Sequence, residues 1–212
     1  SLLTGSDARE ARFREQAPAY ALLHLSSHAQ VDDAHPLFSR VAFAPPQDSS
    51  EDGQLDLGEI FALRLDAEMV VLSACETGTG KLMRGEGIAS LARGFATAGA
   101  RSIITTLWPV NDAATASIME AFYRALKAGA NKDEALRQAK LEYLDRSDRL
   151  GSHPFFWAGY IPVGDMRALP PGTGWVAIAG SLILLIAMGA GASFFWRRRR
   201  ITSRPGGTGY RA

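Results

Sequence analysis

The sequence is poor in cysteine, because its 212 residues include a single one, Cys75. One thiol cannot form an intramolecular disulfide, and it excludes a zinc site built from several thiolates. Cys75 is therefore either a small buried apolar residue or a reactive thiol. The residue count alone leaves both interpretations open.

The sequence also lacks an excess of charge. A formal net charge of +1 implies no global attraction to nucleic acid, and we predict no nucleic-acid contact for this portion. Hydrophobic residues make up 47% and charged residues 21%, which is typical of a globular protein. The chain begins at Ser1 without a methionine or a signal peptide, so we interpret it as the C-terminal part of a longer protein.

Charge is absent altogether from one long stretch. The 22 positions from Trp175 to Trp196 hold no charged residue, and four arginines, Arg197 to Arg200, follow at once. At about 1.5 Å per residue, such a helix crosses roughly 30 Å of hydrocarbon. We therefore predict a transmembrane helix over residues 175–196, with a Pro/Gly linker over 166–174 before it and a basic tail over 197–212 after it.

The basic tail predicts the orientation of this single-pass membrane protein. Under the positive-inside rule the tail is cytoplasmic and the domain before the span is extracytoplasmic. One alternative to the membrane span is a buried core helix. Another is a sorting signal in residues 169–174, whose spacing departs by one residue from the Leu-Pro-x-Thr-Gly pattern.

Apolar runs alternate with amphipathic segments through the first 165 residues. Buried strands are predicted over residues 20–25, 68–75 and 101–107, a weaker strand over 41–43 and a closing strand over 153–161. Helices are predicted over residues 8–16, 56–63, 87–98, 112–128 and 132–146. This alternation favours an α/β domain with a mostly parallel sheet and helices on both faces.

In a parallel sheet the binding site lies beyond the carboxyl ends of the strands. His28 follows the end of the first predicted strand, Cys75 ends the second, and Asp112 lies just past the third. We expect these three residues at a common edge, which favours the reactive thiol over the buried one. A second histidine, His24, lies inside the first strand and is predicted to be a hydrogen-bonded core residue.

A cysteine peptidase needs a thiolate, a histidine that takes its proton, and main-chain amides that hold the oxyanion. The sequence offers such parts in a familiar order. The motifs are residues 71–78 (VLSACETG), 85–87 (GEG), 98–100 (AGA), 107–112 (LWPVND) and 153–158 (HPFFWA). Together they resemble the CHAT domain, a family grouped with caspases, separases and gingipains and often found after tetratricopeptide repeats in bacterial proteins.

The resemblance covers residues 1–165 and implies a caspase-hemoglobinase-like fold without a metal or organic cofactor. By position it implies that His28 is the general base and Cys75 the nucleophile. The main-chain N–H groups of Ala29 and Cys75 would form the oxyanion hole, although the family usually has glycine where this chain has Ala29.

Two acidic residues have a role implied by the resemblance and an alternative one. Asp112 resembles the residue with which separases receive a basic P1 side chain, and the alternative is an N-cap for the helix from Ala113 onward. Glu86 either supports the cysteine loop or stabilises a helix terminus.

The function predicted from these features is a membrane-anchored cysteine-type endopeptidase that cuts a protein partner after basic residues. A repeat domain upstream in the full-length chain would be a further partner. The alternative is a catalytically silent CHAT-fold scaffold in a signalling protein. A small-molecule hydrolase or nucleotide-binding domain is disfavoured, because the chain has no Gly-x-Ser-x-Gly elbow and no correctly spaced phosphate loop.

Overall fold

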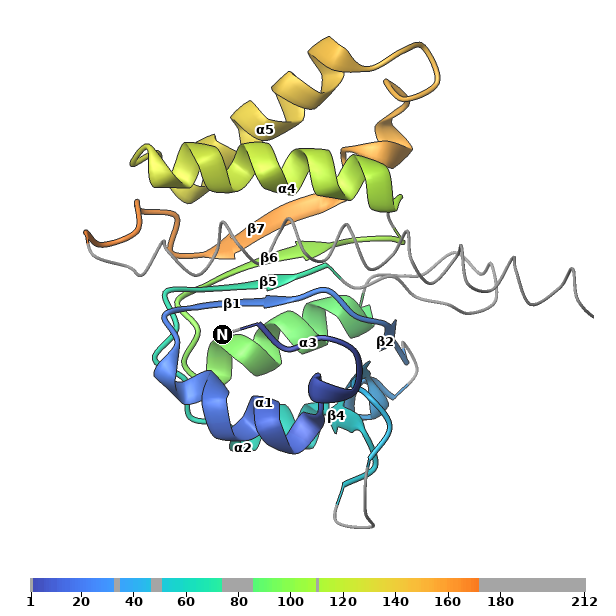
Figure 1. Ribbon diagram of the computed structural model, residues 1–212, viewed down its shortest axis with the longest axis vertical. Helices are drawn as coiled ribbons and strands as arrows, with labels where there is room; N and C mark the ends of the chain where they lie inside the picture. Colours follow the sequence, from blue (N-terminus) through green and yellow to red (C-terminus); the bar gives the residue numbers. More distant parts are fainter. Residues whose placement is uncertain (1, 33–34, 47–50, 74–85, 110, 172–212) are drawn as a thin grey trace, which may run out of the picture. The chain divides into compact units, whose positions relative to one another are not determined.

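A computed structural model describes residues 2–32, 35–46, 51–73, 86–109 and 111–171, without the side chains of residues 86–89 (Figure 1). Its centre is a four-stranded sheet in the order β1-β5-β6-β7. The strands are β1 (Leu22–Leu25), β5 (Met69–Leu72), β6 (Ser102–Thr106) and β7 (Tyr160–Gly164). The first three are parallel and β7 is antiparallel to β6, so the predicted mostly parallel sheet is confirmed.

The register of the sheet aligns the carboxyl ends of the three parallel strands. Leu25 is the partner of Leu72, and Leu72 is the partner of Thr105. The ladder continues one residue further, because the main-chain N–H of Ser73 donates to the oxygen of Leu25 over 2.9 Å. Each of the three strands therefore delivers its following residues to one edge of the sheet.

Helices cover both faces of this sheet, as predicted. Helices α1 (Glu10–Gln16), α2 (Leu57–Ala62) and α3 (Glu86–Thr97) lie on one face, and α4 (Asp112–Lys127) and α5 (Lys132–Arg146) lie on the other (Figure 1). Both faces of β5 are apolar, since its four residues are apolar and all are buried. A buried parallel strand is a near-continuous apolar run for this reason.

A second, small sheet follows the end of β1. Its strands are β2 (Ala29–Gln30), β3 (Arg40–Ala42) and β4 (Gln54–Asp56), and both pairings are antiparallel. The predicted weak strand at residues 41–43 therefore belongs to this sheet and not to the central one. Strands β2 and β4 are too short to show a periodic pattern in the sequence.

The closing strand begins later than predicted. Residues Pro154–Phe156 form a 3-10 turn, and β7 starts only at Tyr160. The reason is local, because Pro154 suits the first turn of a helix and the His153 ring accepts a hydrogen bond from the N–H of Phe155. The prediction of a strand from residue 153 was wrong in its first half.

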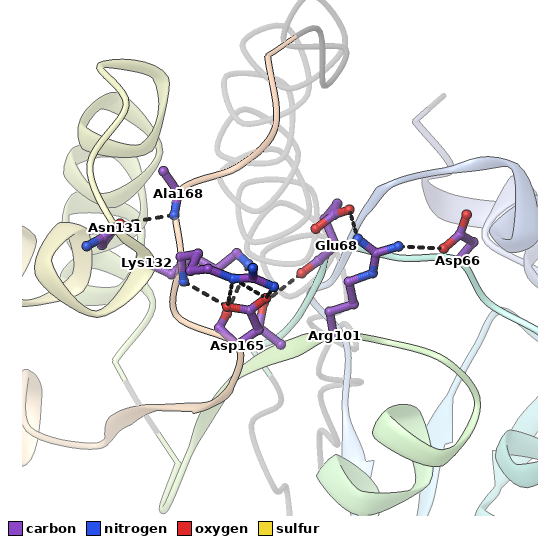
Figure 2. A network of polar contacts seen from close by, with 9 residues as sticks. Asp66, Glu68, Arg101, Asn131, Lys132, Asp165 and Ala168 are labelled. Atoms are coloured by element: carbon purple, nitrogen blue, oxygen red, sulfur yellow. Dashed lines mark hydrogen bonds and ion pairs between the residues drawn. The ribbon is translucent and has the colours of Figure 1, made fainter.

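Beyond β7 the chain stays attached to the domain through residue 169. The main-chain N–H of Lys132 donates to the oxygen of Met166 over 2.8 Å, and the N–H of Ala168 donates to the side chain of Asn131 over 3.1 Å (Figure 2). Leu169 is buried. The first part of the predicted linker is therefore packed against the start of α5.

No helix in the described ranges is both long and apolar enough to cross a bilayer. The predicted span over residues 175–196 and the basic tail lie outside those ranges.

Candidate active site

His28 lies three residues past the end of β1 and is exposed. Its main-chain oxygen accepts a hydrogen bond from the N–H of Ala42 over 2.8 Å, which ties it to the small sheet. The next residue, Ala29, is buried and is the first residue of β2, where it pairs with Val41. A strand position has extended backbone, so alanine replaces the family's glycine there without a left-handed conformation.

Cys75 lies outside the described residues, and so do residues 74–85 as a whole. The last described residue before it is Ser73, whose side chain is 5% exposed. The structure therefore gives the position of the strand that leads to the thiol and gives no distance between Cys75 and His28. The catalytic pair stays a prediction.

The histidine inside β1, His24, has partners on both ring nitrogens. His24 Nε2 lies 3.2 Å from the hydroxyl oxygen of Ser73, and the Tyr123 hydroxyl lies 3.0 Å from His24 Nδ1. Burial lowers the pKa of His24 to about 4, so this imidazole is neutral at physiological pH. The prediction that His24 is hydrogen-bonded inside the strand is confirmed, and the residue is half-buried.

Ser73 extends this set of contacts to the far side of the sheet. Its hydroxyl lies 3.2 Å from that of Tyr160, the fully buried first residue of β7. Burial raises the pKa of the Tyr123 hydroxyl, and Tyr160 adds to that rise. No pattern in the sequence predicted the contacts of Ser73, Tyr123 and Tyr160, and the only signal for Ser73 was its place at the end of a buried strand.

Asp112 and its neighbour have separate roles. The N-cap of α4 is Asn111, whose side-chain oxygen accepts from the N–H groups of Ala113 and Ala114, both over 3.1 Å. Asp112 is the first residue of the helix and is exposed. The alternative in which Asp112 caps the helix is therefore wrong, and its carboxylate is left at the surface beyond the end of β6.

Glu86 is the first residue of α3, a position where a carboxylate complements the helix dipole. Its side chain lies outside the described part of the chain, so its support of the cysteine loop stays a prediction. Among the side chains that are described, no group of three or more His, Cys, Asp or Glu residues could hold a metal ion.

Comparison with known proteins agrees with the fold. A family model described as CHAT domain matches residues 1–165. Tetratricopeptide repeat protein 28 from Homo sapiens is 27% identical over 193 residues, which cover 76% of this chain and 8% of that protein. The Mus musculus protein of the same name is 34% identical over 114 residues, which cover 52% of this chain and 4% of that protein.

This chain spans less than a tenth of the length of either relative. The relatives' name refers to tetratricopeptide repeats and to no activity, and both proteins are mammalian. A bacterial setting therefore stays a prediction.

Proposed function

Because this chain belongs to the CHAT domain family, we propose that it is a cysteine-type endopeptidase whose catalytic pair is His28 and Cys75. The family lies within the caspase-like superfamily, and the mixed α/β fold with a mainly parallel sheet is compatible with it. The observation that carries the proposal is the register of two neighbouring strands.

Leu25 and Leu72 are partners in parallel strands, which lie about 4.8 Å apart. His28 comes three residues after Leu25, and Cys75 comes three residues after Leu72. Two side chains at equal offsets from a register pair start from the same edge of the sheet. This equality supports an imidazole and a thiol within reach of each other.

The chemistry of such a pair follows from its parts. His28 takes the proton of the Cys75 thiol, and the sulfur attacks the carbonyl carbon of the scissile peptide bond. The main-chain N–H groups of Ala29 and Cys75 donate to the oxyanion that forms. The protonated His28 then gives its proton to the leaving amine, and water hydrolyses the thioester to restore the thiol.

Asp112 is the candidate receptor for a basic side chain before the cleaved bond. It is exposed, lies past the end of β6 and is not used as a helix cap. An exposed carboxylate in this place pairs with arginine or lysine by charge-assisted hydrogen bonds. The substrate class is therefore a protein or peptide with Arg or Lys at P1.

The full-length protein would combine this domain with other parts. The relatives' name supports an upstream tetratricopeptide repeat domain as a partner. The apolar residues 175–196 support a membrane anchor, with a cytoplasmic tail and an extracytoplasmic peptidase domain.

A matched set of variants tests the peptidase. The full chain, kept in detergent micelles, is incubated with fluorogenic peptides that differ only in Arg, Lys or Ala at P1. We expect cleavage after Arg and Lys by the wild type and none by Cys75→Ala or His28→Ala. The control is His35→Ala, which removes an exposed histidine with a 71% accessible side chain. Equal cleavage by wild type and Cys75→Ala would overturn the assignment.

A covalent probe also tests for the catalytic pair if the domain cleaves no peptide until it is activated. A peptidyl-arginine chloromethyl ketone should add once to the wild type, and the single thiol makes the mass change unambiguous. The same reagent should add far more slowly to His28→Ala. Labelling that is independent of His28, together with no cleavage, would favour the silent scaffold.

A further inference from the structure

Four side chains form a continuous set of hydrogen bonds that runs from helix α4 across the central sheet. They are Tyr123 of α4, His24 of β1, Ser73 at the end of β5 and Tyr160 of β7. Strands β1 and β7 are the two edge strands of the sheet, so the set spans its full width. We refer to it as the Tyr-His-Ser-Tyr chain.

We propose that the Tyr-His-Ser-Tyr chain is a positioning device for the nucleophile: it fixes Ser73, two residues before Cys75, and so sets the thiol against His28. This inference rests on the proposed peptidase function. None of the four residues is assigned to the reacting atoms.

Ser73 is held by one main-chain and two side-chain hydrogen bonds. Its main-chain N–H is bonded to Leu25 of β1, and its hydroxyl lies 3.2 Å from both His24 Nε2 and the Tyr160 hydroxyl. Ser73 is 5% exposed and Tyr160 is 0% exposed, so the contact between their hydroxyls is buried. Catalytic groups need placement to within about 0.5 Å, which buried partners of this kind provide.

The Tyr-His-Ser-Tyr chain is also electrically neutral. Burial lowers the pKa of His24 to about 4, and neutral imidazole has one donor and one acceptor nitrogen. If His24 Nδ1 accepts from Tyr123, then Nε2 donates to Ser73, and the reverse order satisfies the same atoms. The hydroxyls and the imidazole can therefore be bonded throughout without placing a second charge beside the His28–Cys75 pair.

The readout that separates positioning from stability is the pKa of the Cys75 thiol. A cysteine beside a protonated histidine has a lowered pKa, and only its thiolate reacts with iodoacetamide. Loss of the alignment should raise that pKa toward its ordinary value. At a pH below both pKa values, a rise of one unit lowers the alkylation rate about tenfold, because the thiolate fraction falls by that factor.

The experiment follows alkylation of the full chain in detergent as a function of pH, with unfolding measured for each variant. Ser73→Ala and Tyr160→Phe each remove one hydroxyl of the Tyr-His-Ser-Tyr chain. Tyr143→Phe is the matched control, since it removes a tyrosine hydroxyl bond to the Gly151 oxygen in another part of the domain. At a pH below the pKa of the wild-type thiol, we expect about tenfold slower alkylation in the first two variants and an unchanged profile in the control.

The double variant Ser73→Ala/Tyr160→Phe should be no slower than Ser73→Ala alone, because Ser73→Ala already removes the contact with the Tyr160 hydroxyl. The proposal is overturned if both single variants keep the wild-type profile while His28→Ala raises the thiol pKa; the peptidase proposal then stands. If the wild-type thiol has an ordinary pKa that His28→Ala leaves unchanged, both proposals fail.

Discussion

The ammonium nitrogen of Lys132 donates a hydrogen bond to the main-chain oxygen of Asp165 over 3.0 Å (Figure 2). Lys132 is 1% exposed, so its charge is almost completely withdrawn from water. Asp165 directly follows β7 and its N–H donates to the oxygen of Arg101, which precedes β6. This contact therefore lies at the amino-terminal end of β6, whereas His28 follows the carboxyl end of β1.

Lys132 should make the stability of the domain depend on alkaline pH. Burial lowers its pKa from the ordinary 10.5, although the carboxylates of Asp165 and Glu68 act in the opposite direction. The folded state then releases this proton at a lower pH than the unfolded state, so the protonated lysine costs stability that returns as the pH rises toward 10.5. Urea unfolding of wild type and Lys132→Met should show wild type gaining on the variant as the pH rises from neutral.

The control is Lys127→Met, which removes an exposed lysine at the end of α4. Its stability relative to wild type should stay constant over the same pH range. Parallel pH profiles for wild type and Lys132→Met would contradict the prediction.

Lys132 also illustrates what the sequence could not reveal. The helix over residues 132–146 was predicted, and α5 has those bounds. Its face toward the sheet, however, contains lysines: Lys132 contacts Asp165, and Lys140 donates to the oxygen of Tyr160 over 2.6 Å. A polarity pattern assigns lysines to solvent, and only the main-chain oxygens at both ends of β7 explain why these two lie inward.

The elements that could be predicted are those with a strong period or a buried run. Strands β1, β5 and β6 and all five helices lie within a few residues of their predicted bounds. Strands β2 and β4 of the small sheet were missed because strands of two or three residues show no period. The alternative that placed the cap of α4 at Asp112 was one residue late because Asn and Asp are both good caps. The buried partners of Ser73 come from distant elements that no local pattern connects.

Gly99 should be intolerant of alanine for two reasons that a matched glycine separates. Its φ of +115° is a conformation that L side chains rarely adopt, and an added Cβ would collide with the main-chain oxygen of Leu65. Gly129 also has a positive φ, +90°, but an added Cβ would meet no atom within 4 Å. We expect Gly99→Ala to lower the free energy of unfolding by about 2–4 kcal/mol and Gly129→Ala by about 1 kcal/mol. Equal losses in chemical denaturation would show that the collision is relieved.

His24 should make the domain less stable in mild acid. Burial lowers its pKa to about 4, whereas an unfolded histidine has a pKa of 6.5. Between these values the unfolded state binds more protons, so the stability conferred by neutral His24 is complete above pH 6.5 and is lost as the pH falls toward 4. The loss should be on the order of 2 kcal/mol for wild type relative to His24→Gln.

The direct measurement is the NMR titration of the His24 ring, which should keep its neutral chemical shift down to about pH 5. His35→Gln serves as the control in the unfolding series, because it replaces an exposed histidine. A His24 ring that titrates near pH 6.5 would contradict the prediction.

Asn111→Ala should cost more stability than Asp112→Ala. Asn111→Ala removes the side chain that accepts from two N–H groups at the start of α4, and it should cost about 1 kcal/mol of stability. Asp112→Ala removes only a surface carboxylate in the first turn and should cost about 0.3 kcal/mol. If the carboxylate receives a basic P1 side chain, the same Asp112→Ala variant should lower kcat/KM for Arg and Lys peptides about tenfold and leave an Ala peptide unaffected.

Asp112→Asn gives the sharper comparison, since it keeps the size and shape of the side chain and removes the charge. A preference for Arg over Ala that survives in Asp112→Asn would exclude the carboxylate as the receptor for P1. The preference would then have to come from another acidic residue, and the exposed Asp112 would serve only the dipole of α4. Stability measured on the same samples keeps the two roles apart, because a partly unfolded variant would lose cleavage of all three peptides alike.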